Sequence, residues 1–218
     1  DDYLHPNAKG AKIIAQNVHR YLVPIQQSLC IDKTLGSHMV LQRNRLNTLK
    51  GKGTVGEKVI IEFNQQQYST SVDTLGDWSV QIASQAAGGP YTIQVYTDDE
   101  RIEFSDVWFG DVFLASGQSN MAFPVKSSKG ADSLINRANY SNKIRLFRNK
   151  NLVATNNVSW DAATLEKVND LEFFEGQWEL ASAQSIADFS AVAYSFAKEL
   201  AKAFKDEIPI GIIDMSVG

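Results

Sequence analysis

The chain has 218 residues, of which 44% are hydrophobic and 21% are charged, and its formal net charge is −4. These values are ordinary for a globular protein, and the length allows one large domain or two modest ones. The sequence has no dense cluster of lysine and arginine and no run of about eighteen apolar residues, so it predicts neither a nucleic-acid partner nor a membrane-spanning helix.

The cysteine content and the two ends of the chain indicate which disulfides, metal sites and flanking segments to expect. Cys30 is the single cysteine, which excludes a disulfide within the chain. The CxxC and HExxH spacings of common zinc sites are absent, so the sequence predicts no metal and no other cofactor. The first residues lack the basic and apolar regions of a signal peptide, and the last apolar run stops at Gly218. We therefore expect the chain to be a piece of a polypeptide that continues beyond both ends.

The first predicted segment, residues 1–27, contains an amphipathic helix. Its apolar residues recur at helical spacing, and they are Ala11, Ile14, Val18, Tyr21 and Leu22. Asn7 is a suitable N-cap, and the pattern ends before Pro24. A loop that carries Asp2 and His5 precedes this helix.

Between residues 28 and 108 the hydrophobic period changes to two, as in strands with one buried face. Turn residues separate the apolar runs at Asn64-Gln65, Leu75-Gly76-Asp77, Gly88-Gly89-Pro90 and Asp98-Asp99. Short strands with regular turns favour an antiparallel β-sandwich of about six or seven strands. We place Trp78 in the core of this sandwich; if it were exposed instead, it would be able to stack on sugar rings.

From residue 109 to residue 218 predicted strands alternate with helices, which is typical of an α/β domain. The predicted strands are Asp111 to Ala115, Ile144 to Phe147 and Ile208 to Val217. The last of them is apolar on both faces, as in a parallel sheet covered by helices. A helical stripe runs from Ala193 to Phe204, with Ser190 or Asp188 as its N-cap. The predicted fold class is therefore mixed: an antiparallel β-sandwich, then the front half of a parallel-sheet α/β domain.

The strongest chemical signal is Gly117-Gln118-Ser119-Asn120-Met121, which follows the apolar run that ends at Ala115. A tight turn after a strand lifts a serine hydroxyl above the edge of a sheet, which is how α/β hydrolases present a nucleophile. Ser119 is therefore a candidate nucleophile for acyl transfer. Most serines in turns of this composition are only turn residues, so that alternative stays open.

A serine nucleophile needs a base, usually histidine, and a third group that orients the base. The chain has three histidines, His5, His19 and His38. The last two have no obvious carboxylate partner nearby in sequence, and we predict structural or surface roles for them. Asp2 and His5 have an Asp-x-x-His spacing that can place a carboxylate behind an imidazole; otherwise they belong to a solvated loop.

Several motifs between Ser28 and Gly218 resemble the sialate O-acetylesterase family, which are carbohydrate esterases of the SGNH hydrolase type. They are Met39-Val40-Leu41-Gln42-Arg43, the five residues around Ser119, Phe189-Ser190-Ala191-Val192-Ala193-Tyr194, and Pro209-Ile210-Gly211-Ile212-Ile213 followed by Gly218. The resemblance implies a flavodoxin-like SGNH domain in residues 109–218, acetylated carbohydrate as substrate, and a periplasmic or secreted location.

The same resemblance implies roles for individual residues. Ser119 would be the nucleophile, and its own backbone N–H would help to form the oxyanion hole. Gly218 would be a second backbone donor, although the family usually has a pair of glycines there. Gln118 and Asn120 would lie beside the nucleophile in the binding site. No metal and no cofactor are implied.

Residues Asp2 to Gly10 resemble the final block of a GDSL-type SGNH hydrolase, in which an aspartate and a histidine complete the catalytic site. The resemblance implies two esterase modules in tandem, with the end of one in residues 1–27 and the start of another after it. Asp2 and His5 would serve the preceding module, and the histidine that serves Ser119 would lie beyond this chain. Two alternatives remain: Asp2 and His5 serve Ser119 directly, or the chain is a carbohydrate-binding or spacer module without chemistry of its own.

Overall fold

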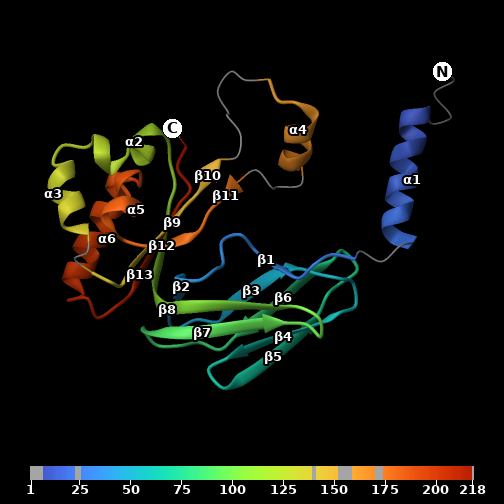
Figure 1. The fold of residues 1–218 in the computed structure, drawn as a ribbon, viewed down its shortest axis with the longest axis horizontal. Helices are drawn as coiled ribbons and strands as arrows, with labels where there is room; N and C mark the ends of the chain where they lie inside the picture. Colours follow the sequence, from blue (N-terminus) through green and yellow to red (C-terminus); the bar gives the residue numbers. More distant parts are fainter. Residues whose placement is uncertain (1–6, 23–25, 139–140, 152–158, 170–173, 218) are drawn as a thin grey trace. The chain divides into compact units, whose positions relative to one another are not determined.

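The structure is a computed structural model that describes residues 7–22, 26–138, 141–151, 159–169 and 174–217, and the statements below refer to these residues. The chain forms two compact units. The first comprises residues 1–32, 48–81 and 94–102, and the second comprises residues 33–47, 82–93 and 103–218. Figure 1 labels the helices and strands of both. No helix among the described residues is long and apolar enough to cross a membrane.

The first unit holds helix α1 and most of the antiparallel strands. Helix α1 (Ala8–Leu22) begins as predicted, because the side chain of Asn7 accepts a hydrogen bond of 2.9 Å from the Gly10 N–H. The strands are β1 (Cys30–Ile31), β3 (Asn47–Lys52), β4 (Lys58–Phe63), β5 (Gln66–Ser71) and β6 (Asp77–Ile82). Strand β1 pairs antiparallel with β3, and β4 with β5. The predicted turn at Asn64-Gln65 is confirmed, with positive φ at both residues, as in the tight hairpins that match strand twist.

One predicted turn is wrong. Gly88-Gly89-Pro90 opens strand β7 (Gly88–Tyr96) instead of ending a strand. A Cβ at Gly89 would lie 2.8 Å from the ring of Trp108, so this glycine permits a close approach to the indole. The next strand, β8 (Arg101–Ala115), ends where the sequence predicts but begins ten residues before the expected start at Asp111.

The core position predicted for Trp78 is confirmed. Its side chain is 3% exposed, and its indole N–H donates a 3.1 Å hydrogen bond to the carbonyl of Lys52. We expect Trp78→Ala to lower the free energy of unfolding by about 3–5 kcal/mol, since a large cavity replaces the ring. Urea denaturation measures this change. Leu75→Ala is the control, because Leu75 is 64% exposed and its truncation should cost less than about 0.5 kcal/mol. Equal effects of the two variants would contradict the core assignment.

The second unit contains the parallel sheet that the sequence predicts. Strand β13 (Ile210–Asp214) lies between β8 and β9 (Ile144–Arg148) and is parallel to both. The short strand β12 (Trp178–Leu180) is antiparallel to β9, and β2 (Val40–Gln42) is parallel to β8. The remaining described strands, β10 (Lys150–Asn151) and β11 (Phe174–Glu175), pair with each other. Helix α4 covers Ala162–Asn169.

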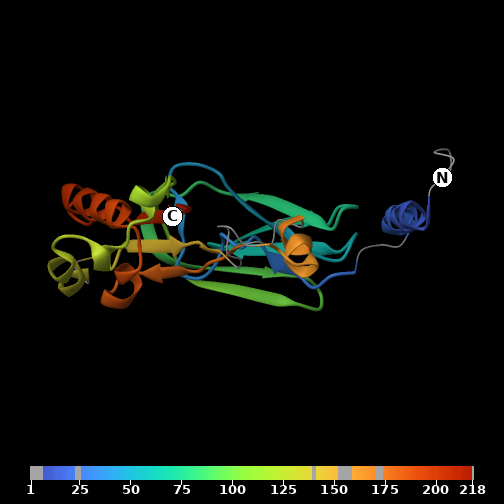
Figure 2. The same cartoon turned by 90° about the horizontal axis from the view of Figure 1, so that it is seen from above.

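Helices α2 (Ser119–Ala122), α3 (Ala131–Asn136), α5 (Ala183–Ala187) and α6 (Ala191–Ala203) lie together in both ribbon views (Figures 1 and 2). The 3₁₀ turn η1 (Val125–Ser127) lies between α2 and α3 in the sequence. Alternate residues of β9 and β13 share one apolar cluster with α5 and α6, and its members include Ile144, Leu146, Ile210, Ile212, Ile186 and Ala197. The predicted N-cap Ser190 is confirmed, since its hydroxyl accepts a 3.1 Å hydrogen bond from the Ala193 N–H.

Tyr194 of α6 is fully buried, and its hydroxyl has no hydrogen-bond partner among the described residues. Burial also raises the pKa of Tyr194. We expect Tyr194→Phe to leave the free energy of unfolding unchanged or to raise it by about 1 kcal/mol, because the variant removes an uncompensated polar group. Tyr96→Phe is the comparison, since the Tyr96 hydroxyl donates a 2.8 Å hydrogen bond to Glu62. Thermal unfolding measures the stability of both variants, and we expect Tyr96→Phe to lose more stability than Tyr194→Phe. A larger loss of stability in Tyr194→Phe would contradict the prediction.

Candidate active site

Ser119 is the first residue of α2 and follows the turn that ends β8. The strand stops at Ala115, the helix begins four residues later, and Ser119 is exposed. Because β8, β13 and β9 run in the same direction, their carboxyl ends meet at one edge of the sheet. The strand and the turn are therefore present where the sequence predicts them, and they place Ser119 at this carboxyl edge.

The chain after β13 pairs with the turn that carries Ser119. The Met215 N–H donates to the carbonyl of Ala115 at 2.9 Å, and the Val217 N–H donates to the carbonyl of Gly117 at 3.0 Å. These bonds hold the segment that follows β13 beside the turn. Gly218 lies outside the described residues, directly after this paired segment.

The residues on both sides of Ser119 are Gln118 and Asn120. Both are exposed, and their predicted places in a binding site stay predictions. The carbonyl of Gln118 accepts from the N–H groups of Met121 at 2.8 Å and Ala122 at 3.0 Å. Within the described residues the N–H of Ser119 makes no hydrogen bond. A free N–H beside the hydroxyl is the donor that a tetrahedral oxyanion needs.

The expected Asp2–His5 pair lies outside the described residues, as does the side chain of His19. His38 is described, and it does have a carboxylate partner: its Nδ1 lies 2.8 Å from Oδ2 of Asp106. Sequence spacing could not show this pair, because 68 residues separate its members. Among the described residues, no three histidine, cysteine, aspartate or glutamate side chains are grouped as metal ligands.

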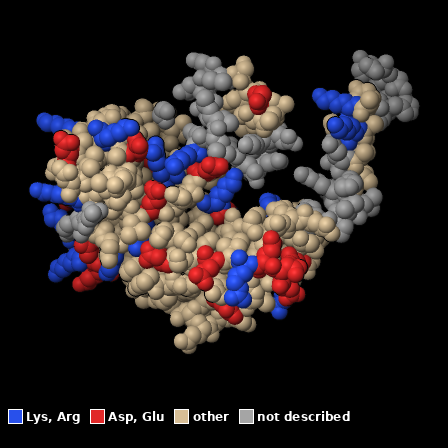
Figure 3. All heavy atoms as spheres, viewed as in Figure 1, with Lys and Arg blue, Asp and Glu red and all other residues tan. Residues whose placement is uncertain are grey.

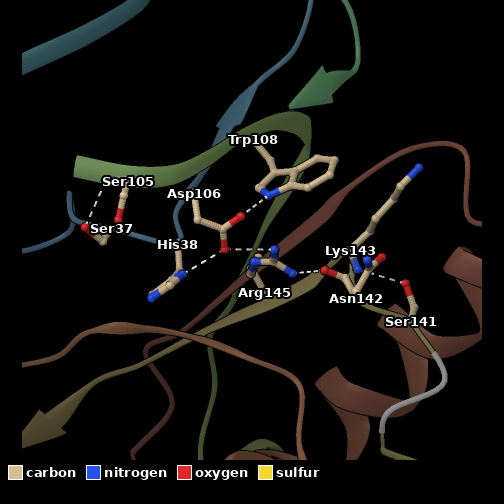
Figure 4. Close-up of polar contacts among 9 residues, drawn as sticks. All are labelled: Ser37, His38, Ser105, Asp106, Trp108, Ser141, Asn142, Lys143 and Arg145. Atoms are coloured by element: carbon tan, nitrogen blue, oxygen red, sulfur yellow. Dashed lines mark hydrogen bonds and ion pairs between the residues drawn. The ribbon is translucent and has the colours of Figure 1, made fainter. Parts of the chain in front are cut away.

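Asp106 is the centre of a polar cluster that Figure 4 shows. It accepts a 2.7 Å hydrogen bond from the Trp108 indole and a 3.1 Å bond from Arg145. The Arg145 side chain is 2% exposed and lies 5.6 Å from the centroid of the Trp108 ring. Burial by itself would raise the pKa of Asp106, but hydrogen bonds from His38 and Trp108 and the charge of Arg145 outweigh it and lower the pKa. Burial lowers the pKa of Arg145, and the Asp106 carboxylate opposes that change.

This cluster is remote from Ser119. Asp106 precedes the end of β8 at Ala115 by nine residues, which is about 30 Å of extended strand. General-base contact requires about 3 Å. His38 is therefore not the base for Ser119, and no other histidine side chain is described near the carboxyl edge.

This chain is similar to sialate O-acetylesterases and to a carbohydrate acetylesterase of known structure, and no family model matches it. The sialate O-acetylesterase of Homo sapiens is 29% identical over an alignment of 201 residues, which covers 84% of this chain and 36% of the human protein. The sialate O-acetylesterase of Pongo abelii is 30% identical over the same shares. A crystal structure of a carbohydrate acetylesterase from Xanthomonas citri aligns with a TM-score of 0.73 and 28% identity, covering 90% of this chain and 41% of that chain. The chain thus spans 36% of the length of these two curated relatives.

Proposed function

Since this chain is a homologue of the sialate O-acetylesterases over 84% of its length, we propose that it supplies the nucleophile of a carbohydrate O-acetylesterase. The observation that carries the proposal is the exposed hydroxyl of Ser119 on a strand–turn–helix at the carboxyl edge of a parallel sheet. We also propose that residues 109–218 are the front of a flavodoxin-like SGNH domain, that residues 28–108 form a β-sandwich domain, and that the protein is periplasmic or secreted.

The proposed reaction has two steps. Oγ of Ser119 attacks the carbonyl carbon of an acetyl group, and the carbonyl oxygen becomes an oxyanion that accepts from the Ser119 N–H and the Gly218 N–H. The bond to the sugar oxygen then breaks, and that oxygen takes the proton which the base removed from Ser119. Water hydrolyses the acetyl-serine and releases acetate, and no step requires a metal.

The proposed base is a histidine that lies outside the described residues. His38 is excluded by its separation along β8, as shown above. We favour a histidine from a later segment of the complete protein, with residues 1–27 as the end of a preceding GDSL-type module. Asp2 and His5 remain the alternative pair within this chain.

Covalent trapping tests the proposal. A fluorophosphonate should react with the complete protein, so that the Ser119 Oγ forms a bond to phosphorus and fluoride leaves. Mass spectrometry of the digested protein should find the adduct on the peptide that contains Ser119. Exposed Ser116 and Ser127 nearby are internal controls and should stay unmodified. Inhibition by the reagent without an adduct on Ser119 would refute the assignment.

A carbohydrate-binding module without chemistry is less well supported. That reading needs an exposed aromatic platform on the predicted sandwich, and Trp78 is buried. Lysine and arginine are interspersed with aspartate and glutamate over the face drawn in Figure 3, which fits a hydroxyl-rich partner as well as it fits an inert surface. The esterase proposal explains the turn at Ser119, and the binding-module reading does not.

A further inference from the structure

Two hollows adjoin each other along strand β12 in the second unit. The larger encloses about 530 Å³ and is lined by His38, Gln177, Trp178, Glu179, Leu180, Ser182, Gln184 and Ser185. This volume lies in the range of about 300–1,000 Å³ that is usual for small-molecule sites. The second encloses about 180 Å³. It shares Gln177, Glu179, Gln184 and Ser185 with the first, so the two form one groove.

His38 forms one end of this groove, and its hydrogen bond to Asp106 fixes the orientation of its ring. The bond from its Nδ1 to Asp106 leaves Nε2 as the ring atom that faces away from the cluster (Figure 4). Asp106 is itself fixed by Trp108 and by buried Arg145. A carboxylate that accepts from Nδ1–H fixes the tautomer of a neutral histidine, so that Nε2 is an acceptor. The groove therefore has a pre-oriented hydrogen-bonding group at this end.

The backbone at the His38 end of the groove has positive φ angles at two residues that are not glycine, and such strain is typical of functional sites. His38 has a φ of 66° and Asp106 a φ of 53°. Such values are uncommon for residues other than glycine and cost of order 1 kcal/mol or more each. The His38 N–H donates to the carbonyl of Ser105 at 3.0 Å, which joins the two irregular segments. The segments that carry His38 and Asp106 hold each other in this strained conformation, and the conformation orients the His38 ring. Strain of this kind indicates a function for the His38 imidazole.

Polar groups line the middle of the groove. The Gln177 amide donates a 2.8 Å hydrogen bond to Oε1 of Glu179, which orients both side chains. Among the described residues, no hydrogen bond is made to the amide oxygen of Gln177 or to the second carboxylate oxygen of Glu179, and both are acceptors. Leu180 is 39% exposed and offers an apolar surface beside them, whereas Trp178 is 4% exposed and offers no face for stacking. Fixed acceptors and donors next to a small apolar surface suit a ligand that carries many hydroxyl groups on a carbon ring.

The other end of the groove reaches the carboxyl edge of the sheet. Arg148, Lys150 and Asp188 line the second hollow. Arg148 is in register with Asp214, and Asp214 is in register with Ala115, where β8 ends. Asp188 also forms a 2.5 Å ion pair with Lys126 of η1, the turn that follows α2. The groove thus ends at the edge that carries Ser119.

We propose that this groove binds a chain of pyranose sugars, with His38 at the far end and Arg148 at the end near the carboxyl edge. The inference rests on the proposed function, because it makes the groove a distal subsite that holds the glycan whose acetyl group reaches Ser119. Sugar hydroxyl groups that donate hydrogen bonds to Nε2 of His38, the amide oxygen of Gln177 and the carboxylate of Glu179 give the affinity. The substrate class is then an acetylated oligosaccharide or polysaccharide in preference to an acetylated monosaccharide.

Calorimetric titration of the complete protein with xylotetraose and with tetragalacturonate tests the groove. We expect binding of at least one probe, and Gln177→Ala and His38→Asn should each raise its Kd about fivefold to tenfold, the equivalent of about one lost hydrogen bond. Asparagine tolerates the positive φ at position 38, so this variant keeps the fold. Preference for tetragalacturonate, reduced in Arg148→Met, would identify an acidic chain, whereas preference for xylotetraose would identify a neutral one.

Two controls separate this inference from the proposed catalysis. Gln81→Ala changes an exposed glutamine outside both hollows and should leave Kd unchanged. Ser119→Ala should also leave Kd unchanged, because Ser119 lines neither hollow. Failure of both probes to bind, or binding that the groove variants do not weaken, overturns the groove. Retained esterase activity in Ser119→Ala overturns the proposed function instead.

Discussion

Replacing Ser119 by alanine is expected to lower kcat for acetyl release from carbohydrate by about 10⁴- to 10⁶-fold, the range for loss of a serine nucleophile. The hydroxyl is exposed, follows the end of β8 and has a free backbone N–H beside it. Release of acetate from acetylated xylan by the complete protein, before and after the substitution, measures the effect.

A matched control makes this test specific. Ser127→Ala changes another exposed serine, in η1, and should leave kcat unchanged. The Ser119→Ala protein should keep its thermal stability, because an exposed hydroxyl without a buried partner contributes less than about 0.5 kcal/mol. A residual rate could come from a serine of a preceding module, and fluorophosphonate labelling would locate it. Activity that persists without such a serine would end the esterase proposal for this chain.

A large loss of stability is expected when Asp106 is replaced. Asp106→Asn leaves the buried guanidinium of Arg145 without its carboxylate, and breaking a buried ion pair in this way costs about 3 kcal/mol or more. Asparagine keeps the shape of the side chain and tolerates the φ of 53°. The substitution therefore isolates the charge from the backbone strain. Urea denaturation measures the loss.

Two further variants test the cause. Asp77→Asn removes a carboxylate whose ion pair with Lys52 is half exposed on both sides, and such a pair contributes only about 0–1 kcal/mol. The double variant Asp106→Asn with Arg145→Met removes the buried charge as well and should recover part of the lost stability. A double variant no more stable than Asp106→Asn would show that the unpaired charge is not the cause.

The contribution of Asp106 depends on pH in a defined direction. Its pKa is lower in the folded chain than the usual value of about 3.9 in an unfolded one. A carboxyl with a lowered folded-state pKa stabilises the fold fully above its unfolded pKa and loses this effect as pH falls through the folded pKa. The difference in unfolding free energy between wild type and Asp106→Asn should therefore shrink as the pH falls below about 4.

Local signals in the sequence predicted much of the fold. The caps Asn7 and Ser190, the hairpin at Asn64-Gln65 and the buried strand after Ile208 depend on residues within a few positions of each other. Periodicity identifies such elements, because burial of one face is a local pattern. The turn at Gly88-Gly89-Pro90 was predicted wrongly for the converse reason: the partner that requires glycine there, Trp108, is distant in sequence.

The polar residues of the second unit also differ in whether the local sequence could predict them. Ser119 could be found from the five residues around it, because a strand and a turn are adjacent in sequence. The cluster of His38, Asp106 and Arg145 could not be found, because β2, β8 and β9 must first pair before these side chains meet. A rule that searches for a carboxylate a few positions from a histidine will miss every pair of this kind.

The hydrogen bond from Val217 to Gly117 has a consequence for how the protein matures. The turn that carries Ser119 is completed by a backbone segment about one hundred residues later in synthesis. Contacts of such long sequence separation form late and open early, because closing the intervening loop costs entropy. Esterase competence should therefore appear in step with protection of the Val217 amide from solvent exchange. Opening of the segment 215–217 alone should abolish the activity of Ser119 while β13 stays paired between β8 and β9.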